Sequence, residues 1–209
     1  MPRTEAQYEA MRADTRRRIE IAAVRLFARQ GFAATSVRDI AREAGISTGL
    51  MYRHHQTKQD LFGDLVAQAA DGLGALARRF RGDVPPAALI REFTREFVHD
   101  VLAGDGFVEF FLIMNQSFTM AEPPAQVRAL RARHVTMMRS AVELIGRGQR
   151  LGQFEQGDAA ELASCYFAAL GGLAMMSFTL GDRFVAPNPA MLTNFLIKEG
   201  TGAGDPTGR

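Results

Sequence analysis

The most informative stretch of the chain is residues 35–58, which read TSVRDIAREAGISTGLMYRHHQTK. Its first half predicts a short helix that starts after an N-cap hydroxyl, Thr35 or Ser36, and ends at Gly45. The inner face of that helix consists of Val37, Ile40, Ala41 and Ala44, which recur at helical spacing. A second short helix follows over residues 48–54. Two short helices joined by a glycine-containing turn predict a helix-turn-helix.

The second of these helices is the part that we expect to enter the major groove of DNA. Ser47 caps its start, and the small residues Thr48 and Gly49 allow the backbone to approach base edges. The nearby groups that suit phosphate oxygens are the Tyr52 hydroxyl, the His54 imidazole, the Lys58 ammonium and the N-cap hydroxyls of Thr35 or Ser36. Many helical hairpins have the same spacing without touching DNA, so periodicity alone leaves that alternative open.

Helical patterns continue on both sides of this stretch. The preceding helix would be capped by Asp14 or Thr15 and ended by Gly31. Its apolar stripe is Ile19, Ala22, Ala23, Leu26 and Phe27. A following helix starts after Thr57, and its inner face is Leu61, Phe62, Leu65 and Val66. The four arginines Arg12, Arg16, Arg17 and Arg18 either add a nonspecific attraction to phosphates or form a solvated face.

The rest of the chain also predicts helices, over residues 87–102, 107–120, 125–146, 159–180 and 190–198. Residues 107–120 and 159–180 are apolar on most sides, which predicts burial. No stretch alternates as a strand does. The expected fold is therefore all-α. It has a helix-turn-helix domain with a flexible N-terminal arm over residues 1–60, a helical effector-binding and dimerisation domain over 61–199, and a disordered glycine-rich tail over 200–209.

Composition and charge favour a soluble DNA-binding protein. Of the 209 residues, 47% are hydrophobic, which is typical of globular chains. No leader and no apolar run of about 18 residues stand out, so we expect a cytoplasmic protein without a membrane partner. Residues 1–60 carry a net charge of +4 and the remainder carries −2. This small excess is consistent with one end that meets a polyanion, or with chance.

Enzymatic chemistry finds little support in the sequence. There is no glycine-rich phosphate loop and no Ser-His-Asp arrangement that can be placed. His54 and His55 are adjacent, so on a helix they diverge by about 100° and make a poor metal pair. The lone Cys165 excludes an intramolecular disulfide and lies among apolar residues, where a thiol is usually inert. We therefore expect no catalytic residue, no metal and no cofactor.

Residues 15–61 resemble the DNA-binding head of the tetracycline-repressor (TetR) family. The resemblance rests on TRRRI at 15–19, AA at 22–23, LFARQGF at 26–32 and TSVRDIAREAGISTGLMYRHHQTKQDL at 35–61. It implies an all-α homodimer that binds a palindromic operator. It also implies a regulator, usually a repressor, that a small molecule releases from DNA.

The resemblance also assigns positions within the head. It places Arg38, Thr48, Gly49 and Arg53 where the family reads bases, and Ser36, Ser47, Tyr52, His54 and Lys58 where it holds the DNA backbone. The sequence departs from the family pattern twice. Leu50 stands where a hydroxyl residue is frequent, and a thymine-methyl contact would replace the polar one. His55 stands where a large aromatic residue is usual, as a buried neutral imidazole or a solvent-facing ring.

The long helices supply candidates for an effector pocket. Phenylalanine and methionine suit an adaptable apolar cavity, although most such residues also fit an ordinary core. The candidates are Phe107, Glu109, Phe111, Met114, Phe118, His134, Met138, Phe167 and Met175. Glu109 lies in an apolar run, where it either faces a ligand or finds solvent or an arginine. A small, largely hydrophobic effector is expected.

The helices near 159–180 and 190–198 are the expected dimer interface, since small residues permit close packing with a second copy. The same residues also suit packing within one chain. The predicted function is thus a DNA-binding regulator, most simply a repressor, that acts as a homodimer on double-stranded DNA. Two alternatives remain: a DNA-binding regulator controlled by a protein partner instead of a small molecule, and a helical enzyme or carrier whose helix-turn-helix is incidental.

Overall fold

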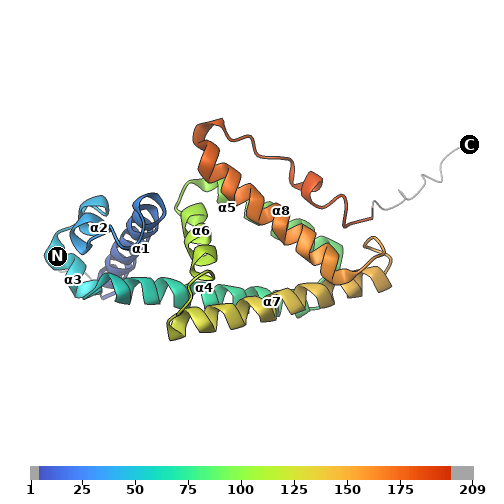
Figure 1. Cartoon of the computed structure of the whole chain (residues 1–209), viewed down its shortest axis with the longest axis horizontal. Helices are drawn as coiled ribbons and strands as arrows, with labels where there is room; N and C mark the ends of the chain where they lie inside the picture. The colour runs from blue at the N-terminus through green and yellow to red at the C-terminus, as the bar shows by residue number, and fades with distance from the viewer. Residues whose placement is uncertain (1–4, 199–209) are drawn as a thin grey trace, which may run out of the picture. The chain divides into compact units, whose positions relative to one another are not determined.

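The computed structural model describes residues 5–198, which form an all-α fold (Figure 1). The helices are α1 (Glu5–Gln30), α2 (Val37–Glu43), α3 (Thr48–His54), α4 (Lys58–Arg81), α5 (Pro86–Ala103), α6 (Phe107–Ser117), α7 (Ala125–Arg150) and α8 (Ala159–Leu180). Two 3₁₀ turns follow, η1 (Gly181–Arg183) and η2 (Pro189–Leu192). The predicted fold class is therefore confirmed. The predicted disordered tail, 200–209, lies outside the described residues.

Two compact units make up the described chain. The first contains residues up to 70 together with 104–130, and the second contains 71–103 together with the residues from 131 onward. The first unit includes α6 because the start of α6 packs on α1. Arg25 donates a hydrogen bond of 2.8 Å to the carbonyl of Gly104, and a Cβ at Gly106 would lie 3.3 Å from Val24. These units do not coincide with the domain division at residue 60 that the sequence suggested.

Helix α1 starts earlier than predicted. The sequence placed its start at Asp14 or Thr15, but the helix already begins at Glu5, and Thr15 donates within it to the carbonyl of Met11 at 2.8 Å. Residues 5–14 contain neither proline nor glycine, and most of them are good helix formers, so nothing interrupts the helix. The described part of the expected flexible arm is therefore helical. The predicted end is confirmed, because Gly31 has a φ of +85° just after Gln30.

The second unit has a core of aromatic and apolar side chains. Phe80, Phe93 and Phe167 form a cluster with ring centroids 5.6–6.4 Å apart. The hydroxyls of Thr94 on α5 and Tyr166 on α8 lie 2.6 Å apart and are both buried. Burial raises the pKa of Tyr166 well above its usual value. This pair satisfies both hydroxyls in the core and joins α5 to α8.

The predicted last helix, 190–198, is wrong. Only Pro189–Leu192 are helical there, as the 3₁₀ turn η2, and the chain then turns into an antiparallel bridge between Phe154 and Ile197. Glu155 donates to the carbonyl of Leu196 at 2.9 Å, and Lys198 donates to that of Gln153 at 3.0 Å. A pairing partner more than forty residues away along the chain uses the backbone groups that a helix would need. One of the two helices expected at a dimer interface is therefore absent from the described chain.

Helix α8 has the predicted bounds but is not wholly buried. Met175, Met176 and Phe178 are 52%, 54% and 38% exposed. Residues 159–183 are long and apolar enough to cross a membrane by length and composition alone, with a mean hydropathy of 1.4 in their most apolar window. No such segment was expected from the sequence. One helix of this kind is weak evidence for a membrane. Its exposed apolar side is the more informative feature.

Candidate nucleic-acid interface

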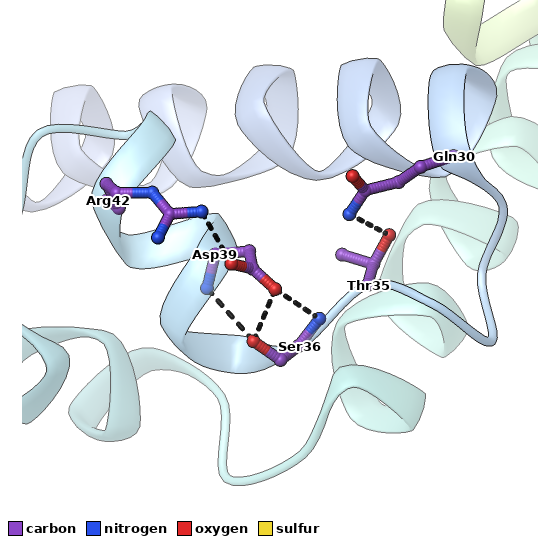
Figure 2. A network of polar contacts seen from close by, with 5 residues as sticks. All are labelled: Gln30, Thr35, Ser36, Asp39 and Arg42. Carbon is purple, nitrogen blue, oxygen red and sulfur yellow. Dashed lines mark hydrogen bonds and ion pairs between the residues drawn. The ribbon is translucent and has the colours of Figure 1, made fainter.

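The start of α2 is fixed by a reciprocal set of polar contacts (Figure 2). The backbone N–H of Asp39 donates to Ser36 Oγ at 3.2 Å, while the backbone N–H and hydroxyl of Ser36 donate to Asp39 Oδ2 at 3.1 and 2.6 Å. These bonds to Ser36 and the neighbouring Arg42 hold the pKa of Asp39 below its usual value. Ser36 is thus the N-cap, with its hydroxyl proton directed at Asp39.

The hydroxyl of Thr35 is buried and is not available at the surface. The residue is 1% exposed, and its hydroxyl donates to the carbonyl of Gly31 at 2.8 Å. The same hydroxyl accepts from Gln30 Nε2 at 3.2 Å (Figure 2). Of the two N-cap hydroxyls that the sequence offered for phosphate contact, only that of Ser36 lies at the surface.

Helix α3 is anchored by one residue and presents its first turn outward. Ser47 Oγ accepts from the backbone N–H of Leu50 at 3.1 Å, which satisfies one of the N–H groups at the helix start. Met51 is fully buried beneath the helix. Gly49 is exposed, and a Cβ built on it would meet no atom within 4 Å. The predicted reading end of the helix therefore faces open space.

The turn between α2 and α3 depends on Gly45 and Arg18. Gly45 has a φ of +64°, a conformation that L side chains rarely adopt. The Arg18 guanidinium donates to the carbonyls of Ala44 and Gly45 at 2.5 and 3.0 Å. Sequence reasoning placed Arg18 among possible phosphate contacts, but its guanidinium positions the turn. The spacing of residues gave no sign of this role, because the partners lie 26 and 27 positions away.

Lys58 lies in a different setting from the one predicted. Its Nζ donates to the carbonyls of Phe32, Ala33 and Thr35 at 2.7, 3.0 and 2.8 Å, and lies 4.7 Å from the centroid of the Phe32 ring. An ammonium group has three donors, so all of them are used within the protein. The side chain ties the first residue of α4 to the loop that precedes α2.

The two adjacent histidines have different surroundings. His54 is half-buried, and burial together with Arg16 and Arg12 lowers its pKa, so the imidazole is neutral at pH 7. It can still donate one N–H to a phosphate. His55 is 5% exposed, with Nδ1 3.5 Å from Asp64 Oδ2 and with no hydrogen-bond partner for Nε2 in the described structure. Burial is the largest cause that lowers its pKa, which selects the buried neutral imidazole of the two alternatives.

Uncommitted donors remain around α3. Tyr52 is 50% exposed, and Arg38 and Arg53 are also exposed; within residues 5–198 none of the three side chains has a hydrogen bond or ion pair. A groove of about 640 Å³ runs beside α3. Its lining residues are Glu9, Arg12, Ala13, Arg16, Arg17, Glu20, Leu50, Arg53 and His54. Three of the four α1 arginines that the sequence singled out, Arg12, Arg16 and Arg17, thus share a groove with Arg53 of α3.

The predicted effector-pocket residues fall in both units. Five belong to the first: Phe107, Glu109, Phe111, Met114 and Phe118. The rings of Phe107 and Phe111 stack, with centroids 6.3 Å apart, and Met114 is buried. The other four belong to the second unit: His134, Met138, Phe167 and Met175. Burial lowers the pKa of His134, whereas Met175 is largely exposed. Their joint role in one pocket stays a prediction.

Comparison with known proteins supports the helix-turn-helix reading. Residues 21–65 match the family described as bacterial regulatory proteins, tetR family. The chain is 35% identical over 81 residues to the HTH-type transcriptional regulator AcrR of Shigella flexneri, an alignment that spans 38% of each protein.

Two solved structures share the fold over most of their length. The MbdR regulator from Azoarcus sp. CIB matches with a TM-score of 0.70 at 21% identity, covering 88% of this chain and 100% of that one. A transcriptional regulator from Saccharomonospora viridis, in complex with choline, matches with a TM-score of 0.64 at 22% identity, covering 90% and 100%. At these identities the likeness establishes the fold. The proteins matched are transcriptional regulators and not enzymes.

Proposed function

We propose that this chain, a member of the TetR family of helix-turn-helix transcriptional regulators, is a cytoplasmic repressor that binds a palindromic operator as a homodimer and leaves it when a small ligand binds. The observation that carries the proposal is the start of α3, where Gly49 is exposed while Thr48 and Leu50 are half-buried. Gly49 has open space around it, and uncommitted side chains of Arg38, Tyr52 and Arg53 lie at the surface of the same helix-turn-helix.

The residues divide into those that read bases and those that hold phosphates. Thr48, Gly49, Arg38 and Arg53 suit base edges, since two of them are small and two carry bidentate donors. Tyr52, Ser47 and His54 suit the DNA backbone as neutral hydrogen-bond donors. Ser36 can join them only by redirecting its hydroxyl proton from Asp39. Lys58 supports DNA binding indirectly, because its ammonium already holds the loop before α2.

A homodimer would present two such heads to one operator. The exposed apolar side of α8, formed by Met175, Met176 and Phe178, is the surface that we assign to the second copy. Burying such a side chain is favourable, at about 25 cal/mol per Å² of apolar surface. Two heads then contact half-sites about one helical turn, or roughly 34–36 Å, apart.

Ligand release would operate by a shift of population. A ligand that favours a conformation with lower operator affinity must supply about 1.4 kcal/mol for each tenfold loss of binding. The choline complex of the Saccharomonospora viridis neighbour supports a small-molecule ligand for this fold. The alternative is control by a protein partner, which would be favoured if no compound in a broad hydrophobic set raised the melting temperature.

Selection from random duplex DNA tests the central claim. Several rounds of binding and amplification should enrich an inverted repeat. The logarithm of the binding constant for that repeat should fall linearly with the logarithm of the salt concentration. Binding that is absent, or that does not depend on salt, would contradict the proposal and support an incidental helix-turn-helix. A selected site without two-fold symmetry would contradict the dimer alone.

A further inference from the structure

A cavity of about 770 Å³ lies within the first unit, apart from the surface of α3. Its lining comes from the end of α1 and the loop that follows it, the start of α4, the end of α6 and the loop that follows it, and the start of α7. This volume falls in the range of about 300–1,000 Å³ that is typical of small-molecule sites. None of the nine residues that the sequence suggested for an effector pocket lines it.

The cavity has an aromatic wall. The rings of Phe27, Phe32 and Phe62 pack on one another, with centroids 5.1, 5.3 and 6.4 Å apart, and all three line the cavity. Ile113 and Met120 add apolar surface from the other side. Such a wall suits a ligand with an apolar body.

The charged residues of the lining are both acidic. Asp60 and Asp64 lie four positions apart on α4, so their side chains share one face of the helix. The lining includes no lysine, arginine or histidine. The cavity therefore combines apolar walls with two negative charges that no basic lining residue offsets.

Both carboxylates have acceptor capacity left for a ligand. Asp60 Oδ2 accepts from the backbone N–H of Thr57 at 3.1 Å, and Asp64 Oδ2 lies 3.5 Å from His55 Nδ1. His55 has a lowered pKa and is neutral at pH 7, so it leaves the charge of Asp64 in place. An ionised carboxylate has two oxygens and about four acceptor positions, most of which remain open here.

We propose that this cavity binds an organic cation with an apolar body, such as a protonated or quaternary amine attached to an aromatic ring. The carboxylates of Asp60 and Asp64 attract the charge, and the phenylalanine rings pack against the body. The face of a phenylalanine ring also attracts a cation that lies within about 6 Å of its centroid, and Phe27 and Phe62 can supply such a face, whereas Phe32 already has Lys58 Nζ 4.7 Å from its centroid. A neutral ligand would leave the two charges without a partner, and an anion would be repelled.

The position of the cavity links it to the helix-turn-helix. Phe32 lines the cavity and also lies beneath Lys58 Nζ, which holds the carbonyls of residues 32, 33 and 35 just before α2. A ligand that displaces Phe32 would therefore disturb the loop that sets the start of α2. This effect on DNA rests on the proposed function, whereas binding of the cation does not.

Calorimetric titration of the full chain tests the binding site directly. We expect benzyltriethylammonium to bind, and the neutral benzyl alcohol and anionic phenylacetate to bind at least about tenfold more weakly. Asp64→Asn should weaken binding of the cation about tenfold, and the double variant Asp60→Asn, Asp64→Asn should weaken it further. Asp71→Asn is the matched control, because Asp71 is an exposed acidic residue of α4 outside the cavity lining.

A second variant removes space instead of charge. Ala67 lines the cavity and its side chain is exposed, so Ala67→Trp should fill part of the cavity with little effect on folding. This variant should weaken binding of the cation without changing the local charge. Circular dichroism and the melting temperature verify that each variant is folded. The proposal is overturned if wild-type protein does not bind the cation at millimolar concentration, or if the double aspartate variant binds it as tightly as Asp71→Asn does.

Titrations with the selected operator then separate the two claims. The cation should lower the affinity of the wild-type protein and of Asp71→Asn for the operator. It should not lower the affinity of the double aspartate variant for the operator. If the cation binds while the chain binds no duplex at all, the cavity assignment stands and the proposed function fails. If the chain binds operator but not the cation, the proposed function stands and the cavity assignment fails.

Discussion

At the scale of single residues, Lys58 has the most definite role in the head. Its three donors all reach carbonyls of the loop before α2. We predict that Lys58→Met lowers operator affinity for all sequences alike while leaving its salt dependence unchanged. The free energy of unfolding should fall by about 1–3 kcal/mol, because the loop carbonyls lose a charged donor. Urea denaturation and DNA titrations at several salt concentrations measure the two effects. A salt slope reduced by about one, with stability intact, would instead indicate a direct phosphate contact.

Arg53 is the residue that we expect to read sequence. It is exposed, lies on α3 and has no hydrogen bond or ion pair in the described chain. We predict that Arg53→Ala changes which base is preferred at one or two operator positions, at a cost of about 1–3 kcal/mol for the original base. Binding to a panel of single-base operator variants measures this. Arg91→Ala, which removes an exposed guanidinium from the second unit, is the control. A uniform loss across the panel would reassign Arg53 to the phosphates.

His55 should make stability depend on pH. Its pKa is lowered in the folded state, so the unfolded chain binds the proton more tightly and stability falls as pH drops below about 6.5. Two other groups titrate nearby: His54, which acts in the same direction, and Glu20, whose raised pKa acts in the opposite one. We predict that His55→Phe removes part of the stability loss between pH 7 and pH 5.5. Its stability at pH 7 should change little, because Nε2 has no partner to lose and the 3.5 Å contact of Nδ1 with the exposed Asp64 contributes little. Denaturation curves at several pH values test the difference, and an unchanged pH profile would show that His55 is protonated equally in both states.

At the scale of elements, two glycines of one motif should behave in opposite ways. Gly45 has a φ of +64°, and its Cβ would lie 3.0 Å from the Arg18 guanidinium, so Gly45→Ala should destabilise the fold by about 1–2 kcal/mol. Gly49 is helical with open space around it, so Gly49→Ala should stabilise slightly, by up to about 1 kcal/mol. The added methyl group should nevertheless weaken DNA binding, because it lies where base edges must approach. Melting temperatures and operator titrations of the two variants measure both effects. Equal destabilisation by both would contradict the geometry of the turn.

The elements that the sequence predicted correctly are those with local causes. Helices α2 and α3 begin after Ser36 and Ser47, whose caps lie within three residues of their partners. The helix over 190–198 could not be excluded from its own residues, since Ile197 pairs with Phe154. The roles of Arg18 and Lys58 were missed for the same reason, because their carbonyl partners are 23–27 positions away. Local pattern therefore predicted where these two helices begin and could not predict which side chains are held by distant carbonyls.

For the complete chain, the exposed apolar side of α8 is the surface that the proposed dimer would cover. Met175 and Met176 are each more than half exposed on a helix whose composition is strongly apolar. Water-facing methionine and phenylalanine side chains on such a helix are what a subunit interface leaves uncovered when a copy is considered alone. The small residues of α8 would let a second helix approach closely.

We predict that Met176→Glu converts the protein to a monomer and weakens binding to the full palindrome by at least about a hundredfold, because each head then binds without the benefit of the other. Binding to a single half-site should be unchanged, since the helix-turn-helix is unaltered. Leu102→Glu is the control, because Leu102 is a 57% exposed apolar residue on α5. Sedimentation velocity gives the oligomeric state, and titrations with full and half operators give the affinities. A Met176→Glu protein that remains dimeric would place the subunit interface elsewhere, and a wild-type monomer that binds the full palindrome tightly would remove the need for an interface on α8.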